Sequence, residues 1–253
     1  KDIFPMAGEY TGEVLTKSLA EFIKQAAPAA LAEQGAAEVS EAAAPLAQLK
    51  PQAVEALGVP VPARPPGFCI GCPERPVFAA LKLMQKELGN VHVSADIGCH
   101  TFGTLPPFNT GSTVLGYGLG LASSSGVGPL MQNRVISVMG DGGFWHNGFT
   151  SGVVNAVYNN QDSVLVILKN GYTSATGTQA IASSPTQPAG KTLTLDIETA
   201  LKGVGVQWIR KITSYNVAEM RDTLHDAMTT NEGGLKVIIA DGECQLERQR
   251  RVK

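Results

Sequence analysis

The chain has 253 residues, of which 43% are hydrophobic and 17% are charged, and its formal net charge is -2. This length is enough for one α/β domain with a full hydrophobic core. The near-neutral charge gives no basic surface for nucleic acid, and no apolar run approaches the roughly 20 residues that span a bilayer.

The first 65 residues differ in composition from the rest of the chain. Apolar residues at helical spacing predict a short helix from Val14 to Ala26. The sequence from Ala27 to Pro65 is rich in Ala and Pro, and such a stretch does not supply a core of its own. We therefore expect residues 1–65 to form a helix and an extended segment that wraps the main domain or links it to another. Because the chain starts with Lys1 rather than Met, we expect a fragment boundary or a processing site there.

From residue 66 to residue 246, short apolar runs alternate with stretches of helical spacing. The apolar runs predict strands at Val91–Ala95, Arg134–Met139, Ser163–Leu168, Val206–Ile212 and Leu235–Ala240. The stretches between them predict helices at Val77–Leu88, Thr113–Ser124, Phe149–Tyr158, Asp196–Lys202 and Val217–Thr229. This alternation indicates a three-layer α/β domain, with a mostly parallel sheet and helices on both of its faces. We interpret residues 247–253 as a solvated tail or the start of a linker.

Two polar motifs follow neighbouring predicted strands. One strand ends in Gly140-Asp141-Gly142-Gly143, and the next ends at Asn170. Ligands of open α/β sheets bind beyond the carboxyl ends of the strands, so we expect Asp141 and Asn170 to face one crevice. Their oxygens and the backbone carbonyl of Tyr172 suit Mg²⁺ that holds a diphosphate, and the glycines leave N–H groups open at a helix N-terminus. The alternative interpretation is an ordinary turn between a strand and a helix.

All four cysteines lie next to the ends of predicted elements. Cys69 and Cys72 open the domain, Cys99 follows the first strand and Cys244 follows the last. Four thiolates suit a 4Fe–4S cluster or tetrahedral zinc, and buried, inert cysteines are the alternative. Their number and spacing do not fit a secreted disulfide scaffold, so we expect a reducing, cytoplasmic location.

The motifs of this chain resemble those of one enzyme family. Gly140-Asp141-Gly142 followed by Asn170 is similar to the metal-binding motif of thiamine-diphosphate enzymes. Phe68-Cys-Ile-Gly-Cys-Pro, Asp96-Ile-Gly-Cys-His-Thr-Phe-Gly and Ile238-Ile-Ala-Asp-Gly-Glu-Cys-Gln-Leu resemble stretches of the 2-oxoacid:ferredoxin oxidoreductases. The closest branch is the catalytic subunit of the indolepyruvate (arylpyruvate) type. The likeness covers about residues 66–246 and implies the thiamine-diphosphate-binding fold.

The resemblance also implies roles for individual residues. Mg²⁺ is expected on Asp141, on Asn170 and on the carbonyl of Tyr172. A 4Fe–4S cluster is expected on Cys69, Cys72, Cys99 and Cys244. His100 is expected near the reacting atoms, where a His handles protons at neutral pH, with a purely structural role as the alternative. Contacts to thiamine diphosphate are expected from Gly98, Cys99, Gly140, Asp141, Gly142, Gly143, Asn170 and Thr173.

The activity implied by the resemblance is the oxidative decarboxylation of a 2-oxoacid. An arylpyruvate would be converted to an acyl-coenzyme A and CO₂, with electrons passing through the cluster to ferredoxin. We find no motif for the carboxylate that thiamine enzymes place against the aminopyrimidine ring, so we expect a second domain or subunit to supply it. The alternatives are a non-oxidative 2-oxoacid decarboxylase subunit, which has no use for four cysteines, and a non-catalytic α/β module.

Three positions depart from the family pattern. Glu74 stands where a His is expected, and Lys169 stands where an acidic residue usually precedes the asparagine. Ala175 stands where pyruvate-specific members have Asn, which argues against pyruvate as the substrate. These departures bear on the substrate and leave the expected cofactor unchanged.

Overall fold

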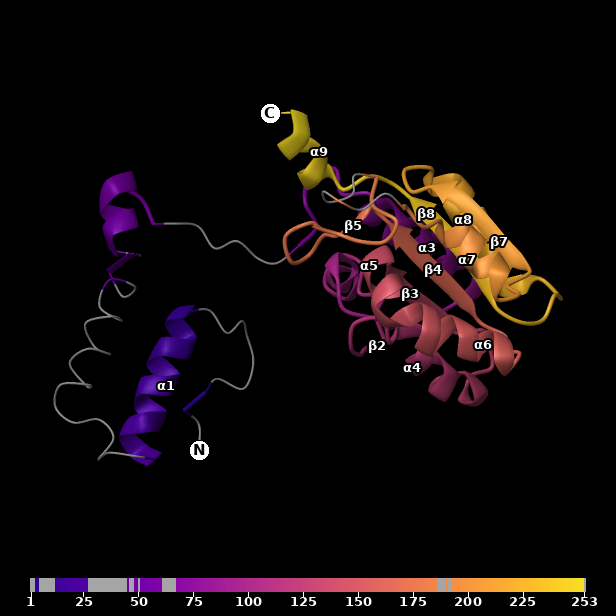
Figure 1. Cartoon of the computed structure of the whole chain (residues 1–253), viewed down its shortest axis with the longest axis horizontal. Helices are drawn as coiled ribbons and strands as arrows, with labels where there is room; N and C mark the ends of the chain where they lie inside the picture. The colour runs from indigo at the N-terminus through magenta and orange to yellow at the C-terminus, as the bar shows by residue number, and fades with distance from the viewer. Residues whose placement is uncertain are drawn as a thin grey trace. The chain divides into compact units, whose positions relative to one another are not determined.

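Figure 1 shows the computed structural model of the chain, which describes residues 3–4, 12–26, 45, 48–49, 51–60, 67–185, 190 and 193–252. The chain divides into two compact units, residues 1–65 and 66–253. In the first unit, helix α1 (Gly12–Ala26) confirms the helix expected from its apolar spacing. Residues 51–57 are also helical, and most of the Ala- and Pro-rich segment lies outside the described residues.

The second unit is built on a parallel sheet. Its described residues form six strands in the order β2-β1-β3-β4-β8-β7, and every neighbouring pair is parallel. The strands are β1 (Val93–Ala95), β2 (Thr113–Val114), β3 (Ile136–Gly140), β4 (Val164–Lys169), β7 (Trp208–Thr213) and β8 (Lys236–Asp241). The central strands β3, β4 and β8 are almost continuously buried, as expected for a sheet covered on both faces. The expected α/β class is confirmed.

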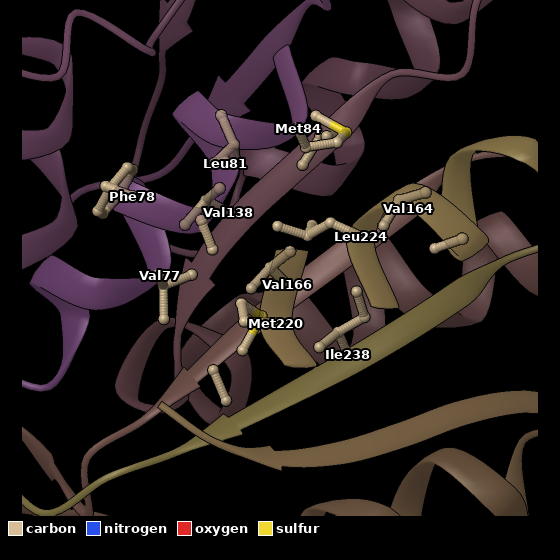
Figure 2. Packing of buried hydrophobic residues seen from close by; sticks show 14 of the residues in the cluster. Val77, Phe78, Leu81, Met84, Val138, Val164, Val166, Met220, Leu224 and Ile238 are labelled. Carbon is tan, nitrogen blue, oxygen red and sulfur yellow. The ribbon is translucent and has the colours of Figure 1, made fainter. Parts of the chain in front are cut away.

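Helices cover the two faces of this sheet and bury alternate residues of its central strands. On one face, Figure 2 shows side chains of α3 (Glu74–Leu88) and α8 (Val217–Thr229) packed over the sheet: Val77, Leu81 and Met84 from α3, Met220 and Leu224 from α8, and Val138, Val166 and Ile238 from the strands. On the other face, Met139, Leu165 and Ile167 pack with residues of α4 (Gly120–Val127), α6 (Asn155–Tyr158) and α7 (Ile197–Gly203). The two cores hold the sheet as the middle of three layers.

A continuous helical stretch follows β3. It begins with α5 (Asp141–Gly143), continues as the π-helical segment η3 (Phe144–Val154) and ends in α6. The helix expected from residue 149 therefore starts eight residues earlier, because the Gly142 and Gly143 backbones adopt helical geometry directly after the strand. π-helical turns are rare and occur often at functional sites.

Three further segments differ from the sequence expectations. The prediction of a helix from Thr113 to Ser124 was wrong in its first half. Thr113 and Val114 pair with β1 as strand β2, and helix α4 begins only at Gly120. The polar loop 170–192 contains a small antiparallel hairpin, β5 (Tyr172–Thr173) with β6 (Gln179–Ala180). Residues 247–252 of the expected tail belong to helix α9 (Gln245–Val252), and residue 253 lies outside the described residues.

Candidate functional site

A cavity of about 210 Å³ lies at the carboxyl ends of the central strands. It is lined by residues that follow β1 (Gly98, Cys99, His100), by the end of β3 and the start of α5 (Gly140, Asp141, Gly142, Gly143), and by the loop after β4 (Asn170, Tyr172, Thr173). These are the residues that the sequence assigned to thiamine diphosphate, to Mg²⁺ and to proton handling. The fold brings them together because parallel strands end at the same edge of the sheet.

Asp141 places a buried carboxylate at the base of this cavity. Its Oδ2 accepts a hydrogen bond from the Gly171 N–H (2.7 Å), and its Oδ1 accepts one from the Gly142 N–H (3.1 Å). Burial raises the pKa of Asp141 to about 7, and the nearby charge of Glu74 adds to this rise against the two N–H donors and Lys169. A carboxylate in this position is oriented by the backbone and is stabilised in its charged form by a cation.

Asn170 faces the same cavity from the end of β4. Its Oδ1 accepts hydrogen bonds from the Tyr172 N–H (3.1 Å) and from the Ser174 hydroxyl (2.9 Å). Its Nδ2 donates to Glu74 Oε1 (2.9 Å). A carboxylate oxygen, an amide oxygen and a nearby backbone carbonyl form the all-oxygen donor set that Mg²⁺ prefers, so the residues present fit that ion.

The glycines of α5 leave no room for side chains. A Cβ added at Gly142 would overlap the Tyr117 hydroxyl and lie 2.5 Å from Thr173 Oγ1. These two hydroxyls hydrogen-bond each other at 2.9 Å across the glycine. At Gly143 an added Cβ would overlap the carboxylate of Asp96. Glycine at these two positions therefore lets the side chains of Tyr117, Thr173 and Asp96 pack directly against the start of this long helix, where the N-terminal end favours a negative charge such as that of a phosphate.

His100 is buried beside this cavity in a charged cluster. Its Nε2 faces Asp96 Oδ1 in an ion pair, and Asp96 Oδ2 accepts a hydrogen bond from the Gly118 N–H (2.8 Å). Burial alone lowers the pKa of His100, but the hydrogen bond and charge of Asp96, together with the charge of Glu74, outweigh burial and raise it. Asp96 thus fixes the orientation of the imidazole ring.

Comparison with known proteins identifies the domain that carries this cavity. Residues 96–240 match the family described as thiamine pyrophosphate enzyme, C-terminal TPP binding domain. The chain belongs to this family. The matched segment begins directly after β1 and reaches β8. It contains Asp141, Asn170 and the hairpin formed by β5 and β6.

Curated relatives of this TPP-binding domain are indolepyruvate oxidoreductase subunits named IorA. The protein from Archaeoglobus fulgidus is 35% identical over 191 residues, which are 75% of this chain and 30% of the relative. The protein from Thermococcus kodakarensis is 26% identical over 261 residues, 97% of this chain and 37% of the relative. The expected likeness to the indolepyruvate type is confirmed, and the chain spans about a third of the length of these relatives.

A solved structure shares the fold. A 2-oxoglutarate:ferredoxin oxidoreductase from Magnetococcus marinus superimposes with a TM-score of 0.62 at 16% identity, over 73% of this chain and 66% of that one. At this identity the match concerns the architecture alone, and it confirms the α/β thiamine-diphosphate-binding fold. Among the described residues, none of the helices has the length and hydropathy to span a membrane.

The four cysteines of this TPP-binding domain are all free thiols near one another. Cys69 is exposed, Cys72 and Cys99 are partly buried, and Cys244 is buried. Burial raises the pKa of Cys99, and the charges of Glu74 and the other three cysteines raise it further. Burial likewise raises the pKa of Cys72 to about 12. Within the part of the chain that the structure describes, no three His, Cys, Asp or Glu side chains are arranged to hold a metal ion, so the iron–sulfur cluster stays a prediction.

Three residues of the site were not assigned from the sequence. Asp96 orients His100, Tyr117 bridges to Thr173, and Glu74 contacts Asn170. Glu74 and Asp96 are 2% and 0% exposed, which is unusual for carboxylates and marks them as part of a polar network. The sequence carried a signal at two of them, since Asp96 opens one of the family-like stretches and Glu74 departs from the family pattern.

Proposed function

We propose that this domain holds the diphosphate of thiamine diphosphate through Mg²⁺, with Asp141, Asn170 and the carbonyl of Tyr172 as the protein ligands of the cation. The observation that carries this proposal is the cavity that Asp141 and Asn170 share. Burial raises the pKa of the Asp141 carboxyl, and the amide oxygen of Asn170 is oriented beside it by a hydrogen bond from the Tyr172 N–H. The N–H groups at the start of α5 and the hydroxyl of Thr173 are proposed as donors to the phosphate oxygens. Gly98, Cys99, Gly140, Gly142 and Gly143 form the surrounding wall.

The reaction that we propose is the oxidative decarboxylation of a 2-oxoacid, an arylpyruvate, to an acyl-coenzyme A and CO₂. The names of the curated relatives support an indolepyruvate-type substrate. The solved neighbour was obtained with 2-oxoglutarate, coenzyme A and succinyl-CoA, which agrees with coenzyme A as the acyl acceptor. When bound, thiamine diphosphate supplies the carbanion chemistry, while the protein orients the reactants and excludes water.

Electrons from this oxidation need an acceptor close to the cavity. Cys99 lines the cavity. Its thiol lies close enough to Cys69, Cys72 and Cys244 for their charges to raise its pKa. We assign a 4Fe–4S cluster to these four thiols, with ferredoxin as the external acceptor, because thiolate-bound clusters reach the low potentials that ferredoxins use. The free thiols also fit the reducing, cytoplasmic compartment expected from the sequence.

His100 is the residue that we assign to proton handling in this reaction. Asp96 holds it at Nε2 and favours its protonated form, and the ring lines the cavity. The carboxylate that faces the aminopyrimidine ring is assigned to a second domain or subunit. The complete active site would therefore lie at an interface between this domain and that partner.

Calorimetry of thiamine diphosphate with Mg²⁺ tests the proposed cofactor site. The wild-type chain is expected to bind the cofactor only when Mg²⁺ is present, and Asp141→Ala is expected to lose at least about 100-fold in affinity, because a ligand of the cation is removed. Binding of equal strength in wild type and Asp141→Ala would overturn the proposal.

The iron and sulfide content of protein purified without oxygen tests the proposed cluster. Four irons and four sulfides per chain, lost in Cys99→Ser, are the expected result. Cofactor binding in a protein that contains no iron under these conditions would instead favour the non-oxidative decarboxylase.

A further inference from the structure

Glu74 is a buried carboxylate that the proposed reaction does not yet use. It is the first residue of α3, which follows the Cys69–Cys72 motif, and it reaches across the fold to a residue 96 positions later in the chain. Its side chain lines the cofactor cavity and is 2% exposed. Burying a charged carboxylate is costly, so a protein that retains one in its interior uses it or neutralises it.

The first contact of Glu74 fixes the amide of Asn170. Glu74 Oε1 accepts a hydrogen bond from Asn170 Nδ2 at 2.9 Å. Asn170 has hydrogen-bond donors only at its NH₂ end, so that end of the amide faces Oε1 of Glu74. The opposite end, Oδ1, then meets the N–H of Tyr172 and the hydroxyl of Ser174, which are both donors. All three contacts agree on one orientation of the amide.

The second carboxylate oxygen of Glu74 has no hydrogen-bond partner among the described residues. Oε2 is buried and makes no hydrogen bond, although the side chain faces the cavity. Asp141 lies on the same cavity and feels the negative charge of Glu74. Glu74 and Asp141 are two carboxylates on one small cavity with His100 as the cationic side chain beside them, so a divalent cation there would supply further positive charge next to the free Oε2.

We propose that Glu74 is a positioning residue of the magnesium site: Oε1 holds the amide of Asn170 with its oxygen toward the cation, and the charge on Oε2 strengthens binding of that cation. This inference rests on the proposed function and adds a residue to it. Residues that orient the ligands of a metal ion without binding it are worth roughly 10- to 100-fold in metal affinity.

Two substitutions separate the two roles of Glu74. Glu74→Gln keeps a hydrogen-bond acceptor for Asn170 Nδ2 but removes the charge. Glu74→Met has a similar size and removes both the acceptor and the charge. With Mn²⁺ in place of Mg²⁺ and saturating thiamine diphosphate, free Mn²⁺ is measured by electron spin resonance. We expect the Kd of Mn²⁺ to rise about 10-fold in Glu74→Gln and about 100-fold in Glu74→Met.

The thermal stability of the same variants excludes a merely structural role. Since Oε2 is buried without a partner, removing its charge is expected to leave the Tm of Glu74→Gln unchanged or higher while Mn²⁺ affinity falls. A structural residue would behave in the opposite way, with a lower Tm and an unchanged Kd for Mn²⁺ in the folded protein. That result would overturn the inference.

Two matched controls complete the experiment. Glu87→Gln removes the same charge from the same helix at a half-exposed position, and its Kd is expected to equal that of wild type. Asp141→Ala tests the site itself. If wild type binds Mn²⁺, Asp141→Ala does not, and both Glu74 variants bind like wild type, the inference fails and the proposed function stands. If wild type shows no Mn²⁺ binding with thiamine diphosphate, the proposed function fails and the inference falls with it.

Discussion

At Gly142 the absence of a side chain determines the shape of the cavity. Tyr117 and Thr173 come from different parts of the chain, and their hydroxyls meet at 2.9 Å over the glycine. An added Cβ would overlap one hydroxyl and lie 2.5 Å from the other, so the bridge between Tyr117 and Thr173 depends on glycine at this position. The same bridge holds Thr173, a proposed phosphate donor, against α5.

The substitution Gly142→Ala is therefore expected to separate Tyr117 from Thr173 and to weaken cofactor binding. Overpacking of this kind costs about 1–3 kcal/mol, which corresponds to roughly a 5- to 150-fold loss of affinity if the cost falls on the bound state. The Kd of thiamine diphosphate with Mg²⁺, measured by calorimetry, checks the expectation. Gly233→Ala is the matched control, because its added Cβ meets nothing within 4 Å. Equal affinity in all three proteins would contradict this account of Gly142.

At the scale of elements, the connection from β2 to α4 depends on a glycine with a positive φ. Gly118 has a φ of +78°, a conformation that other residues rarely adopt. An added Cβ would lie 2.6 Å from the Gly143 carbonyl oxygen and 2.7 Å from the Gly148 N–H nitrogen. Both contacts are backbone atoms of the helical stretch that begins at Asp141, so they do not move aside as a side chain would.

Gly118→Ala is expected to destabilise the fold by about 2–5 kcal/mol, because it combines an unfavourable φ with overlap of two backbone atoms. Gly126→Ala is the matched control: it lies inside α4, its added Cβ meets nothing, and alanine stabilises a helix by about 0.5–1 kcal/mol relative to glycine. Urea unfolding of both variants measures the difference. Similar free energies of unfolding for the two variants would refute the role assigned to Gly118.

The sequence predicted the elements that have a strong periodic pattern. Helix α8 was expected with its observed bounds, since apolar residues such as Met220 and Leu224 recur at helical spacing between polar ones. Strand β2 was missed because it has only two residues, Thr113 and Val114, and its pairing with β1 is a tertiary contact. Short strands of this kind leave no local signal.

The same distinction applies to the site. Asp141 and Asn170 were predictable to share a cavity, because each follows a recognisable central strand of a parallel sheet. The contact between Glu74 and Asn170 was not, since it joins residues 96 positions apart and depends on how α3 packs on the sheet. Its only trace in the sequence is the departure from the family pattern at position 74.

At the scale of the whole domain, a network of charged side chains joins the amino ends of the central strands, at the side of the sheet opposite the cavity. Asp162 precedes β4, and its carboxylate accepts hydrogen bonds from Arg134 Nε (2.7 Å) and from the buried ammonium of Lys236. Arg134 also donates to the carbonyl of Met228 (3.0 Å) in the last turn of α8 and to that of Glu232 (3.1 Å) in the segment that follows the helix. Three strands and one helix of the domain are thus joined through one carboxylate.

This network makes the stability of the domain depend on pH through Asp162. Burial by itself raises the pKa of Asp162, but the hydrogen bonds and charges of Arg134 and Lys236 outweigh it and lower the pKa. A carboxyl group with a lowered pKa in the folded state stabilises the fold above its unfolded value of about 3.9, and this contribution is lost as the pH falls through the folded pKa.

Asp162→Asn is expected to destabilise the domain by about 1 kcal/mol at pH 7, because the buried side chain of Lys236 loses its ionic partner while solvent screens the half-exposed carboxylate. The difference from wild type should begin to shrink as the pH falls below about 4, where Asp162 takes up a proton in the unfolded chain, and should disappear only below its lowered pKa in the folded state. Denaturant unfolding between pH 7 and pH 3 measures this difference directly. Asp222→Asn, at an exposed carboxylate paired with its neighbour Arg221, should show no such dependence. A difference for Asp162→Asn that stays constant down to pH 3 would mean that the carboxylate acts through packing and not through its charge.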